Sequence, residues 1–211
     1  MTSAPEKKIA TKENRDSDEF TDVGACAPQA QSEIRHCHGF LGGGGRTGAI
    51  ELPRLEGRVE ADGSLADFIW FRTGGPAEWL VRPNDAEDLA GFLRELDPAV
   101  PVMPVGVGSN LIVRDGGVPG VVVRLPKAMS HVHIESGNRI RAGGGAMGIS
   151  VASKARDAHV AGLEFLRGIP GTAGGAVRMN AGAYGREMAD ILVEATLVLR
   201  DGRVETWPAA R

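Results

Sequence analysis

The segment formed by residues 168–185 constrains the fold of this chain more than any other part of its sequence. It contains six glycines and one proline, a composition that disfavours an ordinary helix or strand. Glycine also lets another molecule approach the main chain closely. We therefore predict a shaped loop whose backbone N–H and C=O groups hold a flat heterocycle or a phosphate. A glycine-rich connector without a ligand is the alternative.

A second glycine-rich segment, residues 104–120, follows the short apolar run 100–105. The pattern predicts a strand, a turn and a further strand at 118–125. In the turn, residues 106–110 would present successive N–H groups and a hydroxyl suited to a diphosphate. A Rossmann site is the competing interpretation, but its G-x-G-x-x-G pattern requires glycine where Leu111 stands. The sequence therefore predicts a diphosphate-binding turn of another kind.

Three ordered motifs, residues 71–77, 106–117 and 162–185, resemble those of UDP-N-acetylenolpyruvoylglucosamine reductase, the MurB family of bacterial peptidoglycan synthesis. The resemblance covers about residues 52–211. It implies an α+β FAD-binding fold of the vanillyl-alcohol-oxidase (PCMH) type, in which two α/β subdomains hold FAD non-covalently between them. In that family a separate substrate domain follows.

The resemblance also divides the chain into parts. Residues 1–51 are polar and show no helical or alternating period, so we expect a disordered N-terminal extension. Residues 52–126 correspond to the first FAD-binding subdomain. Residues 127–211 correspond to the second, which would be truncated, and the C-terminal substrate-binding domain would be absent.

Site residues are implied only where the motifs match. Tyr184 is expected near the substrate, and the turn and the glycine-rich loop are expected to bind FAD. The implied cofactor-binding residues are Gly106, Val107, Gly108, Ser109, Asn110, Leu111, Gly168, Ile169, Pro170, Gly171, Thr172, Gly174, Gly175, Ala176, Asn180, Gly182 and Ala183.

The resemblance implies a reaction as well. In the family, NADPH reduces FAD, and the reduced flavin reduces the enolpyruvyl group of a UDP-sugar, UDP-N-acetylglucosamine enolpyruvate. An arginine in a Tyr-Arg motif, a serine and a glutamate assist. None of these is matched here, and Arg178 is no counterpart because it lies within the glycine-rich segment, so no catalytic residue is assigned. A non-catalytic FAD-binding module is the alternative function, and an oxidase of the same flavin superfamily is a third.

Charge and composition limit the other possibilities. Twenty-four basic and 27 acidic residues leave a net charge of −3, which does not indicate a nucleic-acid or membrane-surface partner. No apolar run approaches the roughly 18 residues of a membrane span, so we expect a cytoplasmic protein without membrane insertion. Cys26 and the cluster at 36–38 match no zinc spacing, and His131 with His133 is interpreted as a surface pair, so no metal site is predicted.

Local patterns predict the remaining elements. We expect strands at 67–71 and 77–81, a helix capped by Asn84 with Glu87 completing a capping box, and a helix over 147–159 that ends at Gly162. The helix after Asn84 would bury Leu89, Phe92, Leu93 and Leu96, and the later helix would bury Ile149, Ala152 and Ala155. Hairpins are expected over 131–142 and 191–207, turning at 136–138 and 201–202.

Overall fold

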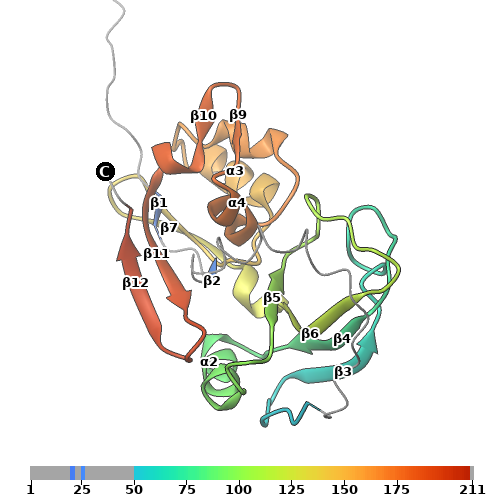
Figure 1. The fold of residues 1–211 in the computed structure, drawn as a ribbon. Helices are drawn as coiled ribbons and strands as arrows, with labels where there is room; N and C mark the ends of the chain where they lie inside the picture. The colour runs from blue at the N-terminus through green and yellow to red at the C-terminus, as the bar shows by residue number, and fades with distance from the viewer. Residues whose placement is uncertain (1–19, 22–24, 27–49, 210–211) are drawn as a thin grey trace, which may run out of the picture.

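The computed structural model describes residues 20–21, 25–26 and 50–209. These residues form two α/β units that lie side by side (Figure 1), each built on its own sheet. The first unit runs from β3 to β6. The second runs from the 3₁₀ helix η3 to β12 and also includes the short strands β1 and β2. No helix in the described ranges is both long enough and apolar enough to cross a membrane.

The first unit has a four-stranded sheet in the order β3-β4-β6-β5, with β3 antiparallel to β4 and the other pairs parallel. The helix α2 covers one face of this sheet, and the chain around Leu65 and Ile69 covers the other. The bounds of these elements are β3 (Arg58–Gly63), β4 (Ala77–Arg82), α2 (Ala86–Glu95), β5 (Val102–Val105) and β6 (Val118–Arg124).

The apolar face predicted for α2 is confirmed, because its four residues are all buried. The predicted cap is wrong. Asp85 is the N-cap, and its side chain accepts the N–H of Asp88 at 2.9 Å. Asp88 itself does not turn to solvent: its carboxylate accepts the N–H groups of Glu56, Gly57 and Asn84 at 2.9, 3.0 and 2.8 Å. Asn84 is therefore a donor in this network rather than the cap.

The strand predicted at 67–71 is also wrong. The N–H of Ile69 donates to the carbonyl of Leu65 at 3.1 Å, so this segment is a tight turn. Leu65 and Ile69, four residues apart, are buried on one side, while Trp70 and Phe71 are exposed. The strand that pairs with β4 is β3, which the sequence did not indicate because β3 is mostly polar and exposed.

The second unit has a sheet in the order β12-β11-β1-β8-β7, with β2 also paired with β11. The helices α3 and α4 pack on its core around Ile140, Val151 and Phe165. The bounds are η3 (Lys127–Ser130), β7 (Val132–Glu135), β8 (Arg139–Ala142), α3 (Gly148–Asp157), η4 (Glu164–Gly168), α4 (Ala173–Met179), β9 (Gly182–Ala183), β10 (Arg186–Glu187), η5 (Met188–Asp190), β11 (Leu192–Val198) and β12 (Val204–Pro208).

Both predicted hairpins of this unit are confirmed. Gly137 and Asn138 have φ of +73° and +58° between β7 and β8, and Gly202 has φ of +78° between β11 and β12. Strand β1 (Phe20–Thr21) runs parallel to β8 and β11 between them, and β2 (Ala25–Cys26) runs parallel to β11. At these four positions the backbone is in strands, unlike the disordered extension expected there. The remaining residues before 50, including the Cys/His cluster at 36–38, lie outside the described residues.

The glycine-rich segment 168–185 differs from its prediction, because it contains the helix α4. Thr172 is the N-cap, and its Oγ1 accepts the N–H of Gly175 at 3.3 Å. The N–H groups of Ala173 and Gly174 donate to the carbonyls of Ala146 and Gly144 at 2.7 and 2.9 Å. Contacts with a distant segment therefore stabilise a helix whose own glycines oppose it.

Helix α3 also ends earlier than predicted. It stops at Asp157, and His159 takes φ of +59°, so Gly162 lies beyond the helix in a later turn. The buried face of α3 consists of Gly148, Val151, Ala152 and Ala155. Ile149 was expected to be buried but is 45% exposed, because it lies two residues before Val151 and therefore on another side of the helix.

Candidate cofactor-binding site

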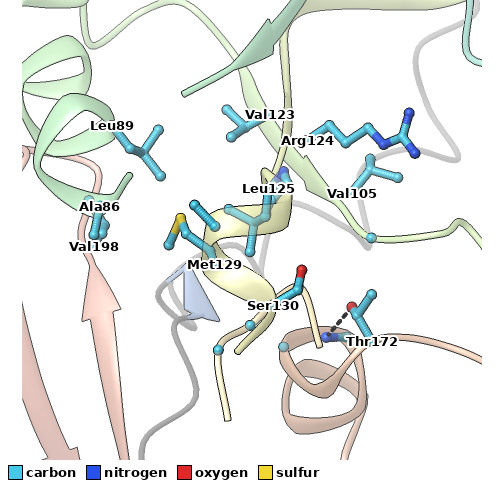
Figure 2. Close-up of a pocket in the computed structure, with 18 of the residues that line it drawn as sticks. Ala86, Leu89, Val105, Val123, Arg124, Leu125, Met129, Ser130, Thr172 and Val198 are labelled. Atoms are coloured by element: carbon cyan, nitrogen blue, oxygen red, sulfur yellow. Dashed lines mark hydrogen bonds between the residues drawn. The ribbon is translucent and has the colours of Figure 1, made fainter. Parts of the chain in front are cut away.

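A cavity of about 590 Å³ lies between the two units (Figure 2). The first unit contributes α2 and the carboxyl ends of β5 and β6, and the second contributes η3, the loop 143–145, the start of α4 and part of β11. Ligands of parallel sheets commonly bind beyond the carboxyl ends of the strands. The cavity lies at that edge, where Val105 at the end of β5 and Arg124 at the end of β6, paired in register, both line it.

The turn predicted to bind a diphosphate begins directly after β5, at this edge. Gly106 faces the second unit so closely that a Cβ there would be 2.5 Å from the Oγ1 of Thr172. Gly108 has φ of +58°, and a Cβ there would be 2.7 Å from the side chain of Ile69. Both positions therefore require glycine. A side chain at Gly106 would collide with the second unit, and one at Gly108 would both collide with Ile69 and be strained by the positive φ.

The backbone of this turn offers unpaired donors. The N–H of Leu111 donates to the carbonyl of Gly108 at 3.3 Å and closes the turn. Within the described ranges, the N–H groups of Gly108, Ser109 and Asn110 have no protein acceptor. Three successive N–H groups in a turn are a common way to bind an anionic oxygen. They stand beside Gly106 and Val107, which line the cavity.

The two glycine-rich segments predicted from the sequence lie together. The hydroxyl of Ser109 donates to the carbonyl of Pro170 at 2.8 Å. Gly171 has φ of +142°, and a Cβ there would be 3.2 Å from the same hydroxyl oxygen. The Ser109 hydroxyl was expected to donate to a ligand, and in this structure it joins the two loops instead.

The amino end of α4 is rich in glycine, but its first N–H groups are not available to a ligand. Its N–H groups at Ala173, Gly174 and Gly175 all donate to protein acceptors. They are therefore not open to an anion, unlike the N–H groups of Gly108, Ser109 and Asn110 in the turn after β5, for which the described residues offer no acceptor. Thr172, Gly174 and Gly175 still line the cavity and shape its wall.

Among the described residues, four basic side chains line the cavity, against a single carboxylate at Asp85. They are Arg124, Lys127, His131 and Arg178. The guanidinium of Arg124 lies over the ring of Phe68, 4.1 Å from its centroid. Partial burial and the positive charge of Arg82 lower the pKa of Arg124. In the part of the chain that the structure describes, Arg124 has no acidic partner. A polyanionic ligand would supply that partner.

The other end of the cavity is apolar. Leu89 of α2, Val123 and Leu125 around the end of β6, and Met129 of η3 line it (Figure 2). Such a wall suits a flat aromatic ring. Sequence reasoning missed Arg124, Met129 and the loop 143–145. For Arg124, a basic residue closing an apolar strand was the only available signal.

The remaining predicted residues lie outside the cavity wall. Asn180 accepts the N–H of Ala189 at 2.9 Å and ends α4 with φ of +44°. Gly168 lies under the ring of Tyr184, which is 86% exposed. The others are in neighbouring loops, in the core or in the small sheet of β9 and β10: Leu111, Ile169, Ala176, Gly182 and Ala183.

The described residues contain no group of three side chains suited to holding a metal ion. His131 and His133 do lie together, with ring centroids 5.2 Å apart and planes inclined by 36°. The position of His131 at the cavity was not anticipated, because both residues were interpreted as a surface pair.

Comparisons with known proteins agree with this arrangement. The model of the FAD binding domain family matches residues 77–207. A UDP-N-acetylenolpyruvoylglucosamine reductase from Sphingopyxis alaskensis is 59% identical over 159 residues, covering 75% of this chain and 53% of that protein. One from Rhizorhabdus wittichii is 61% identical over 151 residues, covering 72% and 49%. The chain therefore spans about half the length of the curated relatives it matches.

Solved structures confirm the fold class. The UDP-N-acetylenolpyruvylglucosamine reductase of Thermus caldophilus superposes with a TM-score of 0.61 at 33% identity, over 74% of this chain and 53% of the other. The 6-hydroxy-D-nicotine oxidase of Arthrobacter nicotinovorans gives a TM-score of 0.56 at 24% identity, over 74% and 36%. The second likeness concerns the fold alone. The predicted α+β FAD-binding fold is confirmed.

Proposed function

Because this chain belongs to the UDP-N-acetylenolpyruvoylglucosamine reductase family of FAD-binding proteins, we propose that it binds FAD non-covalently between its two units. The three successive N–H groups of Gly108, Ser109 and Asn110, which have no acceptor among the described residues, carry the proposal. They fit the diphosphate of FAD, which needs several donors held in a fixed arrangement.

The surroundings of the turn support the same ligand. Arg124 and Lys127 bring positive charge to the cavity. Among the described lining residues, only Asp85 carries a carboxylate. The close approach of Gly106 to Thr172 leaves room for backbone contact and none for a side chain. At the far end, Leu89, Val123 and Met129 provide an apolar wall for a ring system. One ligand that combines a diphosphate with flat rings satisfies all three features.

The proposed reaction is that of the family. Bound FAD would supply redox chemistry, with NADPH as the reductant and the enolpyruvyl group of a UDP-sugar as the acceptor, in cytoplasmic peptidoglycan synthesis. This chain's residues would bind and orient the cofactor and exclude water from the cleft. The family's Tyr-Arg arginine, serine and glutamate match no residue of this sequence, so we assign no catalytic residue and expect flavin binding without turnover from this chain alone.

The proposal is tested by titrating the purified chain with FAD, FMN and riboflavin while following flavin fluorescence. Recognition through the diphosphate predicts the tightest binding for FAD and the weakest for riboflavin. Equal affinities would contradict recognition through the turn. NADPH oxidation is then followed with and without UDP-N-acetylglucosamine enolpyruvate. Substrate-dependent turnover would show that the unmatched groups are not needed.

A further inference from the structure

Arg200 connects the two units at a place remote from the glycine-rich loops. It follows β11 and reaches the first unit, where its guanidinium donates to the carbonyls of Leu93, Asp97 and Val100 at 3.3, 2.7 and 3.2 Å. The first of these carbonyls belongs to the last turn of α2, where the helix leaves its C=O groups without helical partners. The negative end of the helix dipole also favours a cation there.

The turn that carries Arg200 is pressed against the same helix. The carbonyl of Gly202 accepts a hydrogen bond from Arg94 at 3.3 Å. Gly202 has φ of +78°, and a Cβ there would be 2.3 Å from the carbonyl oxygen of Ala90. Figure 1 shows this turn between β11 and β12 beside α2. We call Arg200 and Gly202, with the α2 groups they contact, the α2 clasp.

The α2 clasp is a junction rather than a ligand site. A second cavity of about 320 Å³ lies beside it, lined by Arg94, Arg200, Arg203 and Trp207 among others. Its polar groups are already paired. Arg203 binds the carboxylates of Asp201 and Glu205, and the Trp207 Nε1 donates to Glu205 at 2.8 Å.

The position of the α2 clasp relates it to the main cavity. That cavity ends against Leu89 and Leu93 of α2 and Val198 of β11, the elements that the α2 clasp joins. At the glycine-rich loops, the units are joined by the bond from Ser109 to Pro170. We propose that the α2 clasp fixes the separation of the two units across the cavity, with Arg200 as the positioning residue. Its consequence for FAD rests on the proposed function above, whereas its effect on the separation does not.

The expected size of the effect follows from the populations involved. If the free protein without the α2 clasp spends only about a tenth of its time with the units at the binding distance, the apparent dissociation constant for FAD rises about tenfold. Lysine in place of Arg200 keeps the charge but cannot span three carbonyls from one planar group. We therefore expect the FAD affinity of Arg200→Lys to lie between the affinities of the parent and of Arg200→Ala.

The test measures the separation directly. Spin labels are placed at Glu87→Cys on α2 and Lys154→Cys on α3, both exposed, in the full chain with Cys26→Ser and Cys37→Ser. The parent should give one narrow distance distribution, and Arg200→Ala a broad one. Arg203→Ala is the matched control, because Arg203 lies in the same hairpin and, within the part of the chain that the structure describes, bonds only to that hairpin. Gly202→Ala provides a second way to displace the turn if Arg200→Ala fails to fold.

FAD affinity is measured separately from the distances. FAD affinity should fall about tenfold in Arg200→Ala, and saturating FAD should narrow the distance distribution again. A lower melting temperature with a narrow distribution and unchanged FAD affinity would overturn the proposal, because it would make Arg200 merely stabilising. If the parent does not bind FAD, the proposed function fails, and the distances alone still decide whether the α2 clasp sets the separation.

Discussion

Ser109 and Pro170 join two loops that lie far apart in the sequence, through a hydroxyl-to-carbonyl bond of 2.8 Å. One loop follows β5 in the first unit and the other precedes α4 in the second. The bond therefore lies beside the N–H groups of the turn for which the described residues offer no acceptor, and it holds both glycine-rich segments at the same edge of the cavity. Changes at this place should affect ligand binding more than folding.

Ser109→Ala should weaken FAD binding two- to tenfold. The hydroxyl contributes one neutral hydrogen bond to the protein, about 0.5–1.5 kcal/mol, and holds the turn rather than the diphosphate. The measurement is a fluorescence titration with FAD. Ser153→Ala is the control, because Ser153 makes a similar bond of 2.8 Å to the carbonyl of Ile149 on α3, away from the cavity. Equal losses in both variants would argue against the role of the loop contact.

Gly108→Val should abolish FAD binding. Valine is unfavourable at φ of +58°, and its Cβ would meet Ile69, so the turn must move from the position that presents its N–H groups. Gly116→Val is the matched control, since Gly116 is in the following loop and a Cβ there meets nothing within 4 Å. Circular dichroism checks that each variant keeps its secondary structure. If a folded Gly108→Val retained normal FAD affinity, the diphosphate would have to bind elsewhere.

Arg124→Ala should lower the affinity for FAD more than the affinity for riboflavin. A charged hydrogen bond contributes about 1.5–3 kcal/mol, so we expect roughly a tenfold to hundredfold loss for FAD. Riboflavin lacks phosphate and should lose little. Arg58→Ala removes an exposed arginine of the same sheet that pairs with Glu60 and should change neither affinity. A parallel loss for both ligands in Arg124→Ala would assign Arg124 to packing on Phe68.

Asp88→Ala should reduce stability without a specific effect on the cavity. Its carboxylate accepts three backbone N–H groups near the start of α2, and their loss should lower the free energy of unfolding by about 2 kcal/mol. Chemical denaturation measures this change. Glu87→Ala, one residue earlier and exposed, should cost much less. A similar decrease in both variants would mean that the network around Asp88 contributes little.

Much of the architecture follows from local pattern. The apolar spacing of Leu89, Phe92 and Leu93 predicts α2, and the pair Gly137-Asn138 predicts its hairpin, because both signals act over a few residues. Helix α4 was missed because its stability comes from the distant carbonyls of Ala146 and Gly144.

In the site, too, local features could be predicted from the sequence and contacts between distant segments could not. The sequence predicts a turn suited to an anion at Gly106 and Gly108, because glycine patterns are local. The approach of Gly106 to Thr172 was not foreseeable, because it depends on how the two units meet. The same holds for Arg124, because its lack of an acidic partner among the described residues depends on how the chain folds around it.

The bonds from Ala173 and Gly174 to Ala146 and Gly144 restrict how related sequences can differ in length. Connecting loops usually tolerate insertions and deletions. Here the segment 144–146 and the first residues of α4 are held in register by backbone bonds of 2.7 and 2.9 Å. One added or deleted residue on either side would shift the whole register, so homologues should keep both segments at constant length.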